Sequence, residues 1–265
     1  MSSSHCLNCF ATLEPKQKFC SQCGQKTSIH RLSLHEIGHD ALHYFTHADK
    51  GIFSLLKDLF TKPGQVARDY AAGRRVRYFK PLNFYLIVMG ILVFMTSAFY
   101  TEDLSGSRPL EQRAAYAKTI QEKAYFTAMA GRVKKVNKFI GKYSNAINMM
   151  TVPLFTLIFW LFYLRDRYNY TEHLVANIYF VGFIMLFYAL IITPLNYLIK
   201  NPRLDMVLIG IFFLFEISYR ASAYYAFVHK RGWLYALKAL GVSLLCTALW
   251  AWGTYSLISW YIRKG

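Results

Sequence analysis

Acidic residues are scarce in this chain, with 14 Asp and Glu against 31 Lys and Arg, so its 265 residues carry a formal charge of +17. Hydrophobic residues nevertheless make up 55% of the sequence. This combination excludes an ordinary soluble domain and favours a membrane that contains anionic lipids as the main partner. Nucleic acid is the other usual partner of a basic protein. Because many of the positive charges lie beside apolar runs, we expect no nucleic acid partner.

Several motifs that would indicate an enzyme are also missing. The sequence has no Gly-rich phosphate loop, no nucleotide-binding motif and no recognisable Ser-His-Asp set. Met1 to His5 has no basic n-region and no apolar run follows it, so we expect no cleavable signal peptide. An enzymatic function would therefore depend on the group of histidines described below.

Cysteine is rare, yet four of the five cysteines lie within the first 23 residues. They form two pairs, Cys6-x2-Cys9 and Cys20-x2-Cys23. Two such pairs let a turn at each end aim two thiolates at one tetrahedral Zn²⁺. The alternatives are two disulfides in an exported domain, or free thiols. We favour zinc in a reducing compartment, which places the N-terminus in the cytosol.

A set of four cysteine ligands leaves no open coordination position, so the predicted zinc is structural. The metal would fold a ribbon over residues 1–28, a segment too short to fold alone. Gly24 follows Cys23 directly and permits the positive φ that such a metal-binding turn often needs.

Long apolar runs are abundant, and five of them are predicted to cross a bilayer. They are Leu82–Tyr100, about Ile147–Leu164, Leu174–Ile199, Leu204–Val228 and Ala239–Ile262. Tyr and Trp near several ends suit the membrane interfaces. The predicted fold is an all-α polytopic membrane bundle over residues 82–265. The zinc argument and a small excess of Lys and Arg both favour a cytosolic N-terminus.

Residues 29–81 are predicted to form amphipathic helices that do not cross the membrane. The apolar face carries Ile52, Leu55, Leu56, Leu59 and Phe60, whereas Lys57 and Asp58 fall on the opposite face. Pro63 suits the first turn of a further helix, and Gly73 suits its end. A second amphipathic segment, basic and at about residues 109–144, is expected to lie at an interface.

A basic collar follows Gly73 and consists of Arg74, Arg75, Arg77 and Lys80. We expect these side chains to contact lipid headgroups. The collar is either a plain topology signal or a specific site for lipid or phosphate.

Histidines recur every four residues at His35, His39, His43 and His47. On a helix such residues share one face, so neighbouring pairs could bind a second metal ion. His35-Glu36-Ile37-Gly38-His39 matches the H-E-x-x-H pattern of zinc proteases, in which Glu36 would activate a metal-bound water. The longer metzincin pattern fails, because Leu42 and Phe45 replace its Gly and third His. The alternative is that these histidines bind no metal and form either the polar edge of an amphipathic helix or a packed contact with the neighbouring aromatic residues.

Glu216 and Arg220 lie four residues apart in the fourth span, in the order that favours an ion pair along a helix. Ionisable groups at this depth are costly, so they usually face a bundle interior or a wet cavity. The pair is either an intramembrane polar site or a structural ion pair. Further polar residues could join it, namely Asn148, His173, Asn177 and Asn196.

The segment from Asp49 to Pro81 carries a characteristic order of residues downstream of the cysteine pairs. This order is Asp49 with Gly51, Leu59, Pro63-Gly64, Tyr70, Gly73 with Arg74 and Arg75, and Tyr78 with Pro81. It resembles a family of bacterial multi-pass membrane proteins, domain of unknown function 3667, over roughly the first 90 residues. Ser54 replaces the Thr that many members carry. The resemblance implies a bacterial inner-membrane protein with a cytosolic zinc ribbon and no known reaction.

Three functions are therefore considered. The leading hypothesis is a non-enzymatic membrane scaffold whose ribbon and following helices dock a cytosolic protein partner. The alternative is a small transporter or channel-like protein for an ion, lipid or small solute, with a path past Glu216 and Arg220. The third is a membrane metalloprotease that uses His35, Glu36 and His39.

Overall fold

The computed structural model describes residues 5–15, 17–28, 31–34, 51–99, 107–199 and 201–264. The fold is all-α, and the described residues include five helical segments long and apolar enough to cross a membrane. These segments are Pro81–Ala98, Asn145–Phe162, Tyr170–Leu198, Arg203–Val228 and Trp233–Arg263. The predicted fold class and the number of spans are confirmed. The fifth helix begins at Trp233, six residues before the predicted Ala239.

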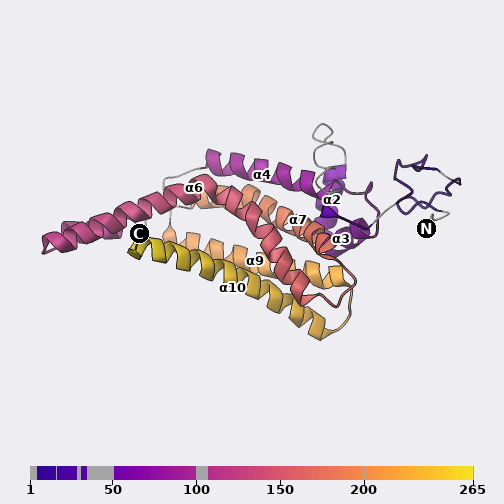
Figure 1. The fold of residues 1–265 in the computed structure, drawn as a ribbon. Coiled ribbons are helices and arrows are strands. Elements are labelled where there is room, and N and C mark those ends of the chain that lie inside the picture. Colours follow the sequence, from indigo (N-terminus) through magenta and orange to yellow (C-terminus); the bar gives the residue numbers. More distant parts are fainter. Residues whose placement is uncertain are drawn as a thin grey trace.

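The helices follow one another as α2 Gly51–Thr61, α3 Pro63–Ala71, α4 Pro81–Ala98, α5 Arg108–Ala115, α6 Ile120–Phe162, α7 Tyr170–Phe187, the π-helix η1 Tyr188–Ile192, α8 Thr193–Leu198, α9 Pro202–Val228 and α10 Trp233–Lys264. In the bundle, α4 packs against α7, α9 packs against α10, and α6 contacts both α7 and α10 (Figure 1).

The two ends of the bundle differ. The cysteine-rich segment, α2 and α3 lie at one end, which we call the ribbon end and which includes the loops 163–169 and 229–232 (Figure 1). At the other end, the first part of α6 extends beyond the bundle (Figure 1). We call this part, residues 120–144, the stalk.

Helix α6 has 43 residues, so it is about 65 Å long at 1.5 Å per residue. Only its last 18 residues form a candidate span, and the stalk continues from that span without a break. The amphipathic segment predicted at about 109–144 therefore corresponds to α5 and the stalk, joined directly to the second span. Thr119 caps the start of α6 by accepting a hydrogen bond from the Glu122 N–H.

Helix α2 confirms part of the predicted face and corrects the rest. Leu55 and Leu59 are completely buried, but the Phe60 side chain is 75% exposed and Asp58 is buried. The prediction for Asp58 was wrong because its carboxylate pairs with Lys62 at 3.4 Å and lies 3.9 Å from Arg77. These cations come from outside the helix, so the periodicity of α2 alone does not reveal them. The Phe60 ring lies 6.5 Å from the Phe183 ring of α7.

Helix α3 begins at Pro63, as predicted, and Gly73 follows its end with a φ of +97°. Gly64 brings α3 against α9. A Cβ atom at Gly64 would lie 2.5 Å from both the Ala226 Cβ and the Phe227 backbone nitrogen. Backbone atoms cannot move aside as a flexible side chain can, so only glycine fits this contact.

Gly64→Ala is therefore expected to lower the free energy of unfolding by about 1–3 kcal/mol, the usual cost of overpacking. Thermal unfolding of the purified protein in detergent measures this change. Gly90→Ala is the matched control, because a Cβ there would meet nothing within 4 Å. Equal stability of the two variants would show that α3 does not approach α9 as described.

The third span changes helix type near its stalk end. The π-helical turn η1 ends two residues before Pro194, and the Thr193 hydroxyl donates to the Tyr188 carbonyl at 3.2 Å. Proline has no N–H to offer the preceding turn, and a π-bulge with a hydroxyl donor is a common local adjustment. Such bulges are frequent at functional sites, and Tyr188 lines the cavity described below.

Candidate functional site

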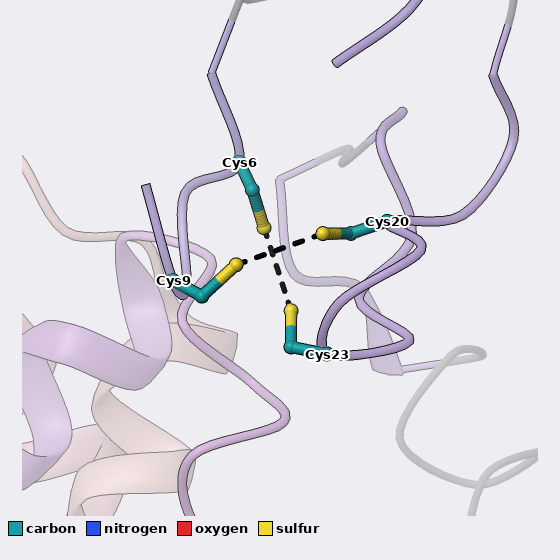
Figure 2. Close-up of side chains that lie close together, drawn as sticks. All are labelled: Cys6, Cys9, Cys20 and Cys23. Atoms are coloured by element: carbon teal, nitrogen blue, oxygen red, sulfur yellow. Dashed lines mark hydrogen bonds between the residues drawn. The ribbon is translucent and has the colours of Figure 1, made fainter. Parts of the chain in front are cut away.

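The four N-terminal cysteines converge on one point. Figure 2 shows their sulfur atoms directed toward a common centre. The Cys6 and Cys23 Sγ atoms are 3.6 Å apart, the Cys9 and Cys20 Sγ atoms are 3.6 Å apart, and all four lie within 4.8 Å of one another. The predicted ligand set is thus assembled closely enough to hold one metal ion.

The two cysteine pairs sit on turns of the same design. The Phe10 N–H donates to the Cys6 carbonyl at 2.9 Å, and the Gly24 N–H donates to the Cys20 carbonyl at 2.9 Å. Gly24 has a φ of +72°, as predicted, and Phe10 has a φ of +63°. The strained conformation of Phe10 was not predicted, although its position directly after Cys9 matches that of Gly24 after Cys23.

The thiols influence one another electrostatically. The pKa of Cys20 is lowered to about 7, first by the hydrogen bond from the Cys23 backbone N–H. The backbone of Ala11 acts to lower the pKa of Cys9, but burial and the three neighbouring thiols together raise it to about 12. Once one thiol has lost its proton, deprotonation of a neighbouring thiol is unfavourable, because the two negative charges repel each other unless a cation lies between them. The donor set therefore fits a metal cation.

The ribbon contacts the collar directly. The Val76 N–H donates to the buried Gln25 side chain at 3.1 Å, and the Arg74 guanidinium lies 5.2 Å from the centre of the Phe10 ring. A second attachment follows the ribbon, where Arg31 makes two hydrogen bonds of 3.1 Å to Glu172 at the start of α7. The cysteine-rich segment is thus attached at two places to the ribbon end of the bundle.

Two of the collar arginines pair with carboxylates of the preceding helices. Arg74 lies 3.3 Å from Asp69, and Arg77 lies 3.9 Å from Asp58. The Tyr78 hydroxyl donates to the other Asp69 oxygen at 3.2 Å, and burial raises the pKa of Tyr78, so the donor proton is kept. Arg74 and Arg77 thus hold α2, α3 and the collar together. Headgroup contact by the collar, including Arg75 and Lys80, stays a prediction.

A partly open cavity of about 280 Å³ lies between helices of the bundle. Its walls come from α4, α6, α7, η1, α9 and α10, and Glu216 and Arg220 are among its lining residues. Thr96, Asn145 and Asn148 also line it, near the places where α4 ends and the stalk joins the bundle. The cavity therefore extends from the middle of α9 toward the stalk end.

Glu216 and Arg220 form the predicted ion pair, in which Arg220 Nη2 donates to Glu216 Oε1. Arg220 is only 1% exposed, and its guanidinium also lies 5.0 Å from the centre of the Phe155 ring. Its other nitrogens, Nε and Nη1, are buried and have no hydrogen-bond partner in the part of the chain that the structure describes. The pair thus leaves donors available beside the cavity.

The other predicted polar residues divide into three groups. Asn148 lines the cavity with the ion pair, whereas Asn177 and His173 are completely buried on α7, nearer the ribbon end. Asn196 does not line the cavity. The prediction missed Tyr224, which stands four residues after Arg220 on α9, a spacing that could have revealed it.

The histidine group lies outside the described residues. His35, His39, His43 and His47, together with Glu36, therefore remain a predicted second metal site or protease motif.

Comparison with known proteins adds one finding. Residues 49–93 match the model of a family described as a protein of unknown function, DUF3667. No curated protein and no solved structure matched the chain. The matched segment contains Gly64 at its contact with α9, Gly73 and the Asp69–Arg74 pair, and it ends in α4. It therefore covers the helices that attach to the bundle and does not reach Glu216 or Arg220.

Proposed function

We propose that this protein is a small multi-pass transporter or channel-like protein and that its path passes Glu216 and Arg220. The observation that carries this proposal is the cavity of about 280 Å³ lined by a buried ion pair in the middle of a predicted span. Ionisable residues inside a membrane are expensive and usually mark a substrate or ion pathway. A pair serving packing alone would need no cavity beside it.

The lining favours a small anion as the solute. Arg220 offers two buried nitrogens, Nε and Nη1, whose N–H groups are not used in its bond to Glu216. The side chains of Asn145 and Asn148 add amide donors to the same cavity. The volume lies just below the roughly 300–1,000 Å³ of sites for drug-sized ligands, so a smaller solute is expected.

Thr96→Phe tests this function by filling the cavity with a ring. In proteoliposomes that contain the purified protein, we expect the influx of labelled chloride, nitrate or phosphate to fall to the level of empty vesicles, because the solute loses its space. Ser97→Phe is the matched control, since the adjacent Ser97 is exposed and does not line the cavity. If wild-type vesicles are no more permeable than empty ones to any of the three anions, the proposal is wrong.

We further propose that the ribbon binds zinc as a structural ion. Four sulfurs placed tetrahedrally at a Zn–S distance of about 2.3 Å are separated by about 3.8 Å. The two separations of 3.6 Å in the structure agree with that value. Zinc held by thiolates, together with the family resemblance, supports a cytosolic N-terminus at a bacterial inner membrane.

Docking of a cytosolic protein is a second candidate function, and the surface of the ribbon supports it. Phe10 is 62% exposed and Phe19 is 53% exposed, on the two metal-binding turns. Exposed aromatic side chains on a rigid module are common anchors for a protein partner. Docking and transport are compatible, because the ribbon and the cavity occupy different parts of the molecule.

A further inference from the structure

A line of buried polar side chains continues from Arg220 toward the ribbon end. We call it the polar seam, and it consists of Tyr224, Asn177, Thr156 and His173, all 0% exposed. The Asn177 amide nitrogen donates to the Tyr224 hydroxyl at 2.6 Å and to the Thr156 hydroxyl at 3.0 Å. The His173 ring is stacked on the Tyr224 ring at a centroid distance of 6.0 Å.

The polar seam contains polar atoms that are not satisfied by the protein. His173 Nδ1 and Nε2 and Asn177 Oδ1 are buried and have no hydrogen-bond partner among the described residues. The same holds for two nitrogens of the neighbouring Arg220. Buried polar groups in proteins are almost always hydrogen-bonded, either to protein or to ordered water. A group of such atoms in one place therefore indicates internal water, which typically binds between polar groups of this kind.

The polar seam has polar residues at both of its ends. Toward the stalk, Arg220 lines the cavity and stands four residues before Tyr224 on α9. Toward the ribbon end, the His173 ring is stacked on the Tyr163 ring at 6.2 Å, and the Lys238 ammonium lies 4.3 Å from the centre of the Tyr163 ring. The polar seam thus lies between the cavity and the ribbon end.

We propose that water molecules fill the polar seam, connect the cavity to the ribbon-end surface and carry protons between them. His173 would take a proton from water at one ring nitrogen and release the proton of its other nitrogen to water on the far side. One proton moves, one N–H bond forms and another breaks, and nothing is oxidised. The carriage of protons rests on the part of the proposed function that places a path at Arg220, and not on an anion as the solute. The presence of water rests on neither.

Radiolytic hydroxyl labelling of the whole protein tests for the water. Tyr179 is the matched reference, because it is also 0% exposed but its hydroxyl donates to the Phe79 carbonyl at 2.6 Å. We expect Tyr224 and His173 to be oxidised about tenfold faster than Tyr179, because radicals form from water held beside them. Equal protection of Tyr224, His173 and Tyr179 would show a dry interior and overturn the proposal.

Proton flux into proteoliposomes, driven by a potassium diffusion potential, tests the path. Tyr224→Phe removes one hydroxyl from the polar seam and is expected to slow the flux about tenfold, while Tyr179→Phe leaves it unchanged. Equal flux in the two variants would overturn proton carriage even if the labelling shows water. If Tyr224→Phe slows protons while Thr96→Phe does not affect any anion, the proton path stands and the anion transport function fails.

Discussion

Replacing Cys6 and Cys20 with Ser is expected to release the metal and unfold the ribbon. The double change removes one ligand from each metal-binding turn, and the two remaining thiolates cannot complete a tetrahedral site. Since so few residues cannot form a stable core alone, folding of this segment depends on the metal. Metal analysis should fall from about one zinc per chain to none. Proteolysis should then cut within residues 5–28 of the variant and spare the wild type.

Cys246→Ser is the control for this experiment. Cys246 is buried in α10, far in the sequence from the ribbon and outside the group of four sulfurs, so its replacement should leave the metal content unchanged. Retention of one zinc in the Cys6→Ser, Cys20→Ser variant would contradict the ribbon site. In that case, loss of the metal on replacing His35 and His39 would assign it to the histidines.

The sequence predicts those features of the fold that depend on local chemistry. Runs of about 20 apolar residues indicate spans wherever they occur, so all five were found. Pro63 and Gly73 mark the limits of α3 because their backbone preferences act within one turn of the chain. The four cysteines were recognised for a similar reason, since their spacing alone fixes the shape of each metal-binding turn.

Features that depend on distant contacts were predicted less well. The buried face of α2 is decided by contact with α3 and α7 and by the charge of Arg77, so Asp58 was assigned to the wrong face. The cavity was suspected through Glu216, Arg220 and the polar residues expected to join them, of which Asn148 does line it. Its remaining walls come from five other elements, and only the assembled bundle brings Asn148 to them. Tyr224 was missed because tyrosine is equally suited to an apolar core and to a polar path.

The collar arginines and Arg220 differ in how far the protein satisfies their charges and hydrogen-bond donors. The collar arginines Arg74 and Arg77 have carboxylate partners on α2 and α3, and their role in holding the ribbon end together explains their position next to the ribbon. Arg220 has one carboxylate partner and two further donors beside a cavity. The first arrangement satisfies its charges within the protein, whereas the second leaves capacity for a ligand. This difference is why the proposed transport function depends on Arg220.

Arg220→Met is expected to destabilise the bundle by about 3–5 kcal/mol, because it leaves the Glu216 carboxylate buried without its partner. The double variant Glu216→Met, Arg220→Met removes both charges and should recover most of that loss, since apolar replacement of a whole buried pair is often neutral or stabilising. Unfolding in mixed detergent micelles, followed by circular dichroism, measures both changes.

Lys134→Met provides the matched control for the loss of one partner. Lys134 and Glu111 form a salt bridge of 2.7 Å between the stalk and α5, with about half of each side chain exposed. Loss of this salt bridge should lower the free energy of unfolding by about 0–1 kcal/mol, as for other surface pairs. If Arg220→Met costs no more than Lys134→Met, then water already reaches Glu216 freely. If instead the double variant is as stable as the wild type and has lost all anion flux, the pair is retained for transport and not for folding.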